Sequence, residues 1–303
     1  MPLHLRLFGG FRVDIFGDLH MGEHRKIKDS RLEHIPWGHK WGFNDTEFFF
    51  HEDNSVELRG KRYMLSGYKM HNFLPYVEKV LGTKMDLEHL KQEREDKPVD
   101  PPRKNESFCK AVEQSFKPDQ MSFDDYDRLL HSHGQTTAEE VYRVLYEKLD
   151  RFADMVFFCE TEEDAVKIIA LAEDHDVCLV PYGGGTSVSC ALLLPTDEER
   201  MIVSVDMRRM NKIEWIDDKN MQACVQAGIR GMDLEAEMNE KGFTIGHEPD
   251  SIELSTLGGW IATNASGMKK NKYGNIEECV ENITLITSRG AVEQVQPLCC
   301  AAV

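Results

Sequence analysis

Three consecutive glycines constrain this chain more than any other feature of its sequence. They lie in residues 180–189, VPYGGGTSVS, directly after the apolar run Val177–Val180, which predicts a short buried strand. Glycine accepts backbone conformations that a side chain forbids, and it lets the main chain approach a ligand closely. Successive N–H groups in such a turn can hold phosphate oxygens, and Thr186 and Ser187 add two hydroxyl donors. The sequence therefore predicts an anion-binding loop.

Two familiar phosphate-binding motifs do not fit this loop. No lysine follows the glycines as it does in a Walker loop, and the glycines are not spaced as in a Rossmann turn. A single glycine-rich turn after a strand is more often a plain loop than a ligand site. The interpretation as a cofactor loop therefore depends on a second stretch further along the chain.

The second stretch covers residues 246–267, GHEPDSIELSTLGGWIATNASG. Its glycines and small residues let a flat ring lie directly against the backbone. The alternative is a helix start capped by Ser255 or Thr256, with glycines that serve close packing. Two such stretches in one α+β unit favour a dinucleotide-like cofactor.

Composition excludes several classes of protein. The formal net charge of −17 over 303 residues argues against nucleic acid as the main partner. No apolar run approaches the ~20 residues that cross a bilayer, and no signal-peptide core opens the chain. The eight cysteines form no CxxC pair, and no Cys/His cluster has the spacing of a zinc site. The sequence predicts free thiols in a reducing compartment and no metal.

Hydrophobic periodicity predicts an α+β fold with a change of pattern near residue 150. Residues 1–35 have no clean period and are interpreted as an ordinary leader. Residues 1–150 form a mainly helical N-terminal region with a charged, Pro-interrupted linker near 93–106, and residues 151–303 form a second domain of alternating strands and helices. The predicted helices are 72–80, 123–130, 141–149, 161–172 and 232–241; the predicted strands are 155–158, 177–180 and 201–206, with hairpins at 47–58, 212–226 and 283–295.

Several local stretches together resemble one enzyme family. The pairing of PYGGGTS with TLGGWIATNASG is similar to the flavin-binding domain of the vanillyl-alcohol oxidase and p-cresol methylhydroxylase family. Within this family the chain most resembles the ether-lipid branch, from about Trp37 to Glu293, and the stretches that carry this resemblance are 41–45, 60–63, 65–67, 246–251, 266–271 and 273–277. The resemblance implies a p-cresol methylhydroxylase-type FAD domain of two α+β subdomains.

The resemblance also implies which residues contact FAD. Those expected to hold the pyrophosphate are Pro181, Tyr182, Gly183, Gly184, Gly185, Thr186 and Ser187. Those expected to line the ribityl chain and the isoalloxazine ring are Pro249, Asp250, Ser251, Ser255, Thr256, Gly258, Thr263, Asn264, Ala265 and Ser266. No His or Cys lies within 183–187, so FAD is expected to be bound non-covalently. Asn264 stands where the ether-lipid branch is expected to carry arginine.

The reaction that the resemblance implies is an exchange without net oxidation. The acyl chain of acyl-dihydroxyacetone-phosphate leaves and a long-chain fatty alcohol replaces it, so the expected class is a transferase that uses FAD. A peroxisomal location and a homodimer are implied as well, and the resemblance allows peripheral association with a membrane. Arg12-Val13 and Leu19-His20 have the wrong spacing for a peroxisomal N-terminal address.

The family continues beyond Glu293 with more of the flavin domain and a cap that carries its catalytic groups. We therefore expect an incomplete form with little or no activity and assign no catalytic residue. The alternatives are a non-catalytic FAD-binding or interaction fragment, and a generic FAD oxidase of the same family. For His247, a structural role with hydrogen bonds inside a tight turn is favoured over proton transfer. For Lys269-Lys270, a solvated pair is favoured over a phosphate contact.

Overall fold

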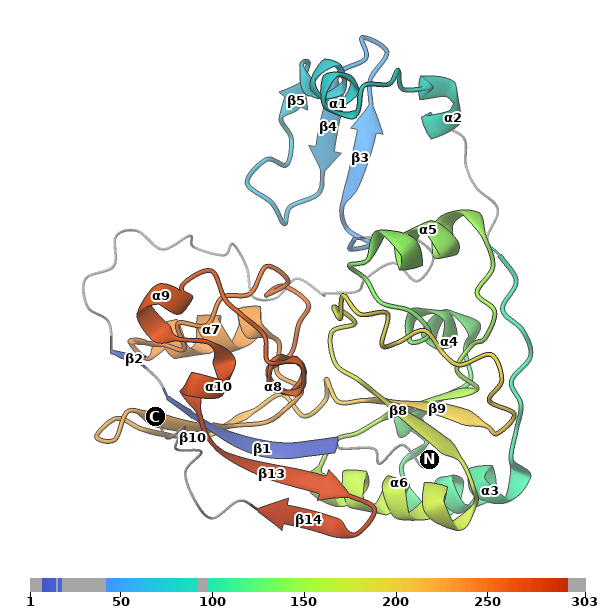
Figure 1. Ribbon diagram of the computed structural model, residues 1–303, viewed down its shortest axis with the longest axis vertical. Coiled ribbons are helices and arrows are strands. Elements are labelled where there is room, and N and C mark those ends of the chain that lie inside the picture. Colours follow the sequence, from blue (N-terminus) through green and yellow to red (C-terminus); the bar gives the residue numbers. More distant parts are fainter. Residues whose placement is uncertain (1–6, 15, 18–41, 92–96, 294–303) are drawn as a thin grey trace.

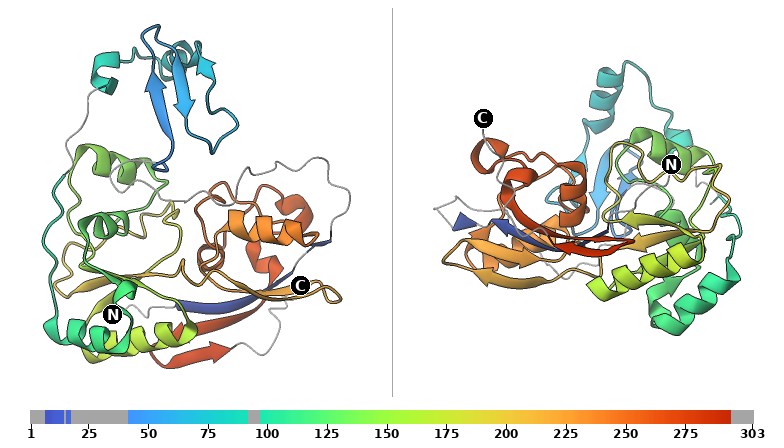
Figure 2. Two further views of the ribbon diagram at one scale, coloured as in Figure 1. Left: turned by 180° about the vertical axis from the view of Figure 1, so that it is seen from behind. Right: turned by 60° about the horizontal axis from the view of Figure 1, so that its bottom comes forward.

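The computed structural model describes residues 7–14, 16–17, 42–91 and 97–293. They form a small sheet at one end of the molecule and a larger body that contains two sheets (Figures 1 and 2). The two body sheets lie side by side, and helices cover them. This mixed arrangement confirms the predicted α+β class.

The small sheet contains the first predicted hairpin. Strands β3 (Glu47–Phe50), β4 (Val56–Arg59) and β5 (Lys69–Met70) pair antiparallel, with Phe50 opposite Val56. Helix α1 (Phe73–Leu81) follows, and helix α2 (Leu87–Lys91) comes after it. Gly82 ends α1 in the left-handed conformation at φ 66°, which only glycine adopts without strain, as the sequence predicts.

The first body sheet places the glycine loop. Its order is β6 (Met121–Ser122), β7 (Met155–Phe158), β9 (Ile202–Asp206) and β8 (Cys178–Tyr182), and the last three are parallel. The helices around it are α3 (Glu106–Ser115), the 3₁₀ turn η1 (Pro118–Gln120), α4 (Asp125–Leu130), α5 (Ala138–Tyr146) and α6 (Glu162–Asp174). Because parallel strands end at one edge, Tyr182 and Asp206 lie together there.

Helix α6 has the N-cap and the apolar face that the sequence predicts. Thr161 accepts a hydrogen bond from the N–H of Asp164 at 3.1 Å, which satisfies one of the free donors of the first turn. The predicted apolar face is buried against the sheet, and its members are Ala165, Ile168, Ile169 and Ala172. Helix α5 ends at Tyr146, three residues before the predicted Leu149.

The second body sheet is antiparallel, in the order β10 (Ile213–Asp217), β11 (Gln222–Val225), β1 (Leu7–Asp14), β13 (Val280–Thr287) and β14 (Gly290–Glu293). Helices α7 (Gly231–Glu240), α8 (Leu257–Thr263), α9 (Lys270–Tyr273) and α10 (Ile276–Cys279) cover one face (Figure 1). A short pair joins β2 (Phe16–Gly17) to β12 (Phe243–Thr244). The core between sheet and helices includes Val225, Leu234 and Trp260.

The interpretation of residues 1–35 as an ordinary leader is wrong for residues 7–14 and 16–17, and the remaining residues of this range lie outside the described part of the chain. Strand β1 is the central strand of the second sheet, where Phe11 pairs with both Val225 and Ile283. It joins two hairpins that lie more than 200 residues further along the chain, so no local pattern could reveal it.

The description of residues 1–150 as mainly helical is incomplete, because the described part of this region contains six strands, β1–β6. Phe108 and Val112 of α3 lie in the same core as Phe157 and Ile168, so residues on both sides of position 150 pack together. The position of the domain boundary stays a prediction.

Within the described ranges, no helix is long and apolar enough to cross a membrane. In the same residues no group of three or more His, Cys, Asp or Glu side chains is arranged to hold a metal ion. Within the described residues no disulfide joins the cysteines, which are Cys109, Cys159, Cys178, Cys190, Cys224 and Cys279.

Candidate cofactor site

The glycine loop offers a row of unused backbone donors. Residues 183–187 follow β8 at the carboxyl edge of the parallel strands. Among the residues that the structure describes, none accepts a hydrogen bond from the five backbone N–H groups of this loop or from the Thr186 hydroxyl. Buried or half-buried N–H groups are nearly always paired, so a row of free ones fits an anion.

The loop is pressed against the second predicted stretch. A Cβ atom at Gly184 would lie 1.9 Å from the carbonyl oxygen of Leu254, and one at Gly183 would lie 2.4 Å from the Thr256 hydroxyl. The glycines therefore do allow close approach, but their partner is the protein backbone itself. The fold brings Gly183 and Gly184 against residues 254–256, and the contact of both segments with FAD stays a prediction.

A third segment, between α4 and α5, completes the loop's surroundings and was missed by the sequence analysis. The backbone N–H of Gln135 donates to the carbonyl oxygen of Gly185 at 2.6 Å. The Thr136 hydroxyl donates to the carbonyl oxygen of Thr186 at 3.0 Å. Both bonds use loop carbonyls and leave the N–H groups free. No spacing signal marks this segment, because its role depends on where α4 and α5 pack.

A buried ionic cluster supports the start of the loop. Asp206, at the end of β9, accepts hydrogen bonds from Arg208 Nη2 at 2.6 Å and from His131 Nε2 at 3.0 Å. Burial alone would raise the pKa of Asp206, but Arg208 and His131 hold it well below its usual range. The His131 ring packs on Tyr182 at 4.3 Å between centroids, and burial raises the pKa of Tyr182 to about 12. Tyr182 is thereby fixed directly before Gly183.

Two hydroxyl groups of the second stretch, those of Ser255 and Thr256, form hydrogen bonds with residues of helix α8. Thr256 caps α8 by accepting from the N–H of Gly259 at 3.3 Å, which is the helix-cap alternative of the sequence analysis. Ser255 Oγ accepts from Trp260 Nε1 at 2.7 Å. At the far end, Asn264 ends the helix in the left-handed conformation at φ 49°. Helix α8 spans roughly 10 Å at 1.5 Å per residue, so residues 263–266 lie at the opposite end from the glycine loop.

His247 is buried without a hydrogen bond. Its side chain is 3% exposed, and neither ring nitrogen finds a partner among the described residues. Its ring packs edge-on against Trp260 at 4.9 Å, and a Cβ at Gly267 would lie 3.1 Å from Nδ1. Burial lowers the pKa of His247 to about 4, so the ring is neutral near pH 7. The predicted hydrogen-bonded structural role is therefore wrong, and the unpaired nitrogens fit contact with a polar ligand.

Of the two lysines predicted to be a solvated pair, Lys270 is exposed as predicted, whereas Lys269 is ion-paired. Lys269 Nζ forms an ion pair with Glu248 at 2.6 Å, and this bond raises the pKa of Lys269. Lys270 begins the short helix α9 and is exposed. Met268 N also donates to the Glu248 carbonyl oxygen at 2.8 Å. These two bonds hold residues 268–269 against Glu248, the residue that follows His247.

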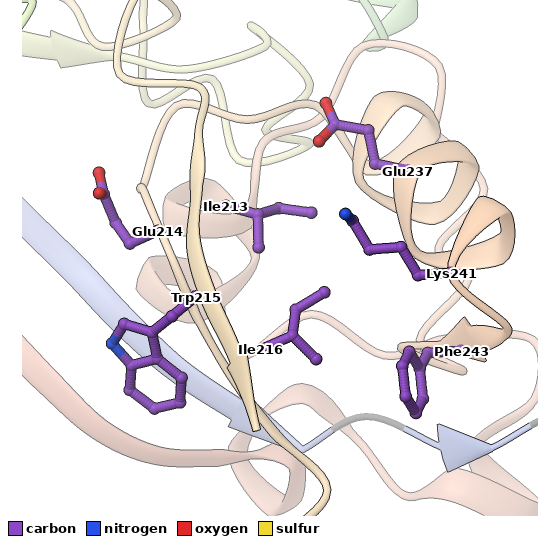
Figure 3. A pocket seen from close by; sticks show the side chains of 7 residues that line it. All are labelled: Ile213, Glu214, Trp215, Ile216, Glu237, Lys241 and Phe243. Atoms are coloured by element: carbon purple, nitrogen blue, oxygen red, sulfur yellow. The ribbon is translucent and has the colours of Figure 1, made fainter. Parts of the chain in front are cut away.

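A pocket of about 450 Å³ lies elsewhere, between β10, α7 and β12 (Figure 3). Ile213 and Ile216 face α7, which contributes Glu237, and Lys241 directly follows the helix. None of the residues that line this pocket belongs to the predicted cofactor contacts.

Comparison with known proteins agrees with the geometry of the loop. Residues 153–296 match the model of a family described as an FAD binding domain. The chain therefore carries an FAD-binding domain, and FAD is its cofactor.

More specific relatives share most of the chain. Alkyldihydroxyacetonephosphate synthase of Caenorhabditis elegans is 39% identical over 274 residues, which are 90% of this chain and 45% of the relative. The Trypanosoma brucei brucei synthase is 34% identical over 276 residues, 89% of this chain and 44% of the relative. A solved alkyldihydroxyacetonephosphate synthase structure matches with a TM-score of 0.76 at 29% identity, over 86% of this chain and 49% of that chain. The chain is thus a homologue of the alkyldihydroxyacetonephosphate synthases, and it spans about half the length of these relatives.

Proposed function

We propose that the chain binds FAD non-covalently, with the diphosphate held by the backbone N–H groups of residues 183–187. The observation that carries this assignment is the row of five N–H groups with no acceptor among the described residues. The Thr186 hydroxyl adds a donor, and residues 249–256 lie against the loop where the rest of the cofactor would continue. Residues 263–266 would reach the ring from the far end of α8. His247, neutral and unpaired, would meet a polar edge of the ligand.

The reaction proposed for the whole protein is the exchange of the acyl chain of acyl-dihydroxyacetone-phosphate for a long-chain fatty alcohol. The homology to synthases of this name supports it. When bound, FAD supplies electronic chemistry at carbon that no side chain of the protein provides. The residues of this chain bind and orient the cofactor, and the apolar core beside α8 excludes water from one side. A peroxisomal location, a homodimer and peripheral association with membranes belong to the same proposal.

The test starts with purified protein and FAD. Flavin fluorescence should be quenched on titration with FAD, and denaturation should release all of the flavin, because the bond is non-covalent. The FAD-loaded protein is then given acyl-dihydroxyacetone-phosphate and a labelled fatty alcohol, and the amount of labelled alkyl product is measured. Absence of FAD binding overturns the cofactor assignment. Binding without labelled product leaves the cofactor assignment in place and agrees with the little or no activity expected of this chain, whereas clear formation of labelled product overturns that expectation.

A further inference from the structure

We propose that Arg208 and Arg230 form an anion site beside the glycine loop and bind a phosphate group. The proposal deepens the proposed function and rests on it, because it needs a ligand that carries phosphate. It concerns two side chains that neither the sequence analysis nor the loop motif singles out. Both come from segments that contact residues 182–183 and 256.

Arg208 reaches the start of the loop from β9. It comes two residues after Asp206, which lies beside Tyr182 in the parallel pair β8–β9. The guanidinium carbon of Arg208 lies 5.2 Å from the centroid of the Tyr182 ring, and Nε and Nη2 bind Asp206. This places the cation next to the residue that precedes Gly183.

Arg230 reaches the same place from the other sheet. It pairs with Thr256 in an antiparallel bridge, in which the side chains of the two partners lie on one face. The Thr256 hydroxyl is the atom nearest to a Cβ placed at Gly183. The side chain of Arg230 therefore lies on the same face of the bridge as that of Thr256, the face toward the glycine loop. Gly228, two residues before Arg230, packs so tightly on residues 207–208 that its Cβ would lie 2.9 Å from Arg208 Cα.

The charges are close enough to influence one another. Burial lowers the pKa of Arg230, the carboxylate of Asp233 opposes this, and the positive charges of Arg208 and Arg62 lower the pKa further. Mutual repulsion of like charges is unfavourable, and an anion placed between them offsets it.

Both arginines keep donors for a ligand. Arg208 binds Asp206 and Arg230 binds Asp233 through Nε and Nη2, and in the described part of the chain Nη1 of either residue donates to no acceptor. The side chains are 26% and 24% exposed, so solvent and ligands reach them. Arginine presents its donors in a planar fork that matches phosphate oxygens. Two sources share this chemistry: the diphosphate of FAD and the phosphate ester of a substrate.

The experiment compares Arg230→Gln and Arg208→Gln with a matched control. Arg143→Gln is the control, because Arg143 also pairs with carboxylates, those of Glu139 and Asp150, but lies on the outer face of α5. Affinities are measured for FAD, for riboflavin, which lacks phosphate, and for inorganic phosphate added to FAD-loaded and to flavin-free protein. Arg208→Gln removes a counter-ion of buried Asp206 and is expected to lower stability, so Arg230→Gln decides the outcome.

We expect at least about a tenfold loss of affinity for one phosphate-bearing ligand in Arg230→Gln, because a charge-assisted hydrogen bond is lost. Riboflavin binding and the Arg143→Gln protein should be unchanged. Loss of FAD affinity alone identifies the cofactor diphosphate, and loss of inorganic phosphate from FAD-loaded protein alone identifies a substrate phosphate. Unchanged affinity for both in a folded Arg230→Gln protein overturns the proposal. If the unsubstituted protein binds no FAD, the proposed function fails, and phosphate titration of flavin-free protein still decides whether the arginines bind an anion.

Discussion

The absence of a side chain at Gly184 allows the glycine loop to contact Leu254 and Ser255. Gly184→Val places methyl groups against the carbonyl of Leu254, so the loop cannot keep its place on residues 249–256. We expect a stability loss of more than about 2 kcal/mol from overpacking and the loss of FAD binding. Thermal unfolding and flavin titration measure both effects.

The control for this change is Gly242→Ala. Gly242 has a positive φ, 81°, and an added Cβ would meet no atom within 4 Å. This variant carries conformational strain without a clash, at a cost of roughly 1–2 kcal/mol, and should bind FAD normally. If Gly184→Val retains FAD, the loop does not hold the cofactor.

A substitution at Thr186 tests the proposed phosphate contact of the loop with a smaller change in side-chain volume than Gly184→Val. Thr186→Val keeps the shape of the side chain and removes the hydroxyl, which donates to no described residue. FAD affinity should fall by about ten- to a hundredfold if the hydroxyl donates to a phosphate oxygen. Thr287→Val, which removes a hydroxyl that donates to Gly290 in the β13–β14 turn, should leave it unchanged. An equal affinity for the two variants would show that the Thr186 hydroxyl contacts no phosphate.

His247 predicts a pH dependence of stability. Its pKa in the folded protein is about 4, below the usual histidine value of 6.5, so between these values the unfolded chain binds the extra proton. Stability is therefore lost as the pH falls through this window, by about 2 kcal/mol from this group between about pH 7 and about pH 5. Urea unfolding of the parent and of His247→Gln at both pH values measures the difference. Equal pH dependence in the two proteins would contradict burial of the neutral ring.

At the scale of elements, strand β1 decides whether the second sheet forms. Arg12 pairs with Cys224 on one side and with Asn282 on the other, so a proline there removes a ladder donor in a central strand. We expect Arg12→Pro to cost about 3 kcal/mol or more, with faster hydrogen exchange in β11 and β13. Arg12→Ala is the matched control and should have a small effect. Normal protection in β11 and β13 of Arg12→Pro would show that β1 does not occupy the centre of the sheet.

At the scale of the whole molecule, the loop between β4 and β5 of the small sheet contacts Glu253 of the second stretch through Tyr63. Its hydroxyl donates to Glu253 Oε2 at 3.1 Å across 190 positions of sequence, and burial together with Glu253 raises the pKa of Tyr63 to about 12. Tyr63→Phe should cost roughly 1 kcal/mol and increase hydrogen exchange in β3–β5 more than in the body. Tyr68→Phe, at a tyrosine that is 65% exposed, should change neither. Equal exchange in both variants would show that this bond does not hold the small sheet.

The sequence determined the elements that carry their own local signals. Thr161 and the apolar face of α6 fixed that helix, Gly82 and Gly242 ended α1 and α7, and the turn residues placed three hairpins. Such signals act within a few residues, through caps, periodicity and backbone conformation. The glycine loop was identified in the same way, since only glycine permits its close approach.

Only the tertiary structure decided what depends on distant partners. Strand β1 lies between β11 and β13 and pairs with both, and the Gln135–Gly185 bond exists because the segment between α4 and α5 lies against the loop. The unpaired state of His247 and the influence of the Arg208 charge on Arg230 are of the same kind. No local pattern encodes these contacts, because burial and charge at each residue are set by segments far away in the chain.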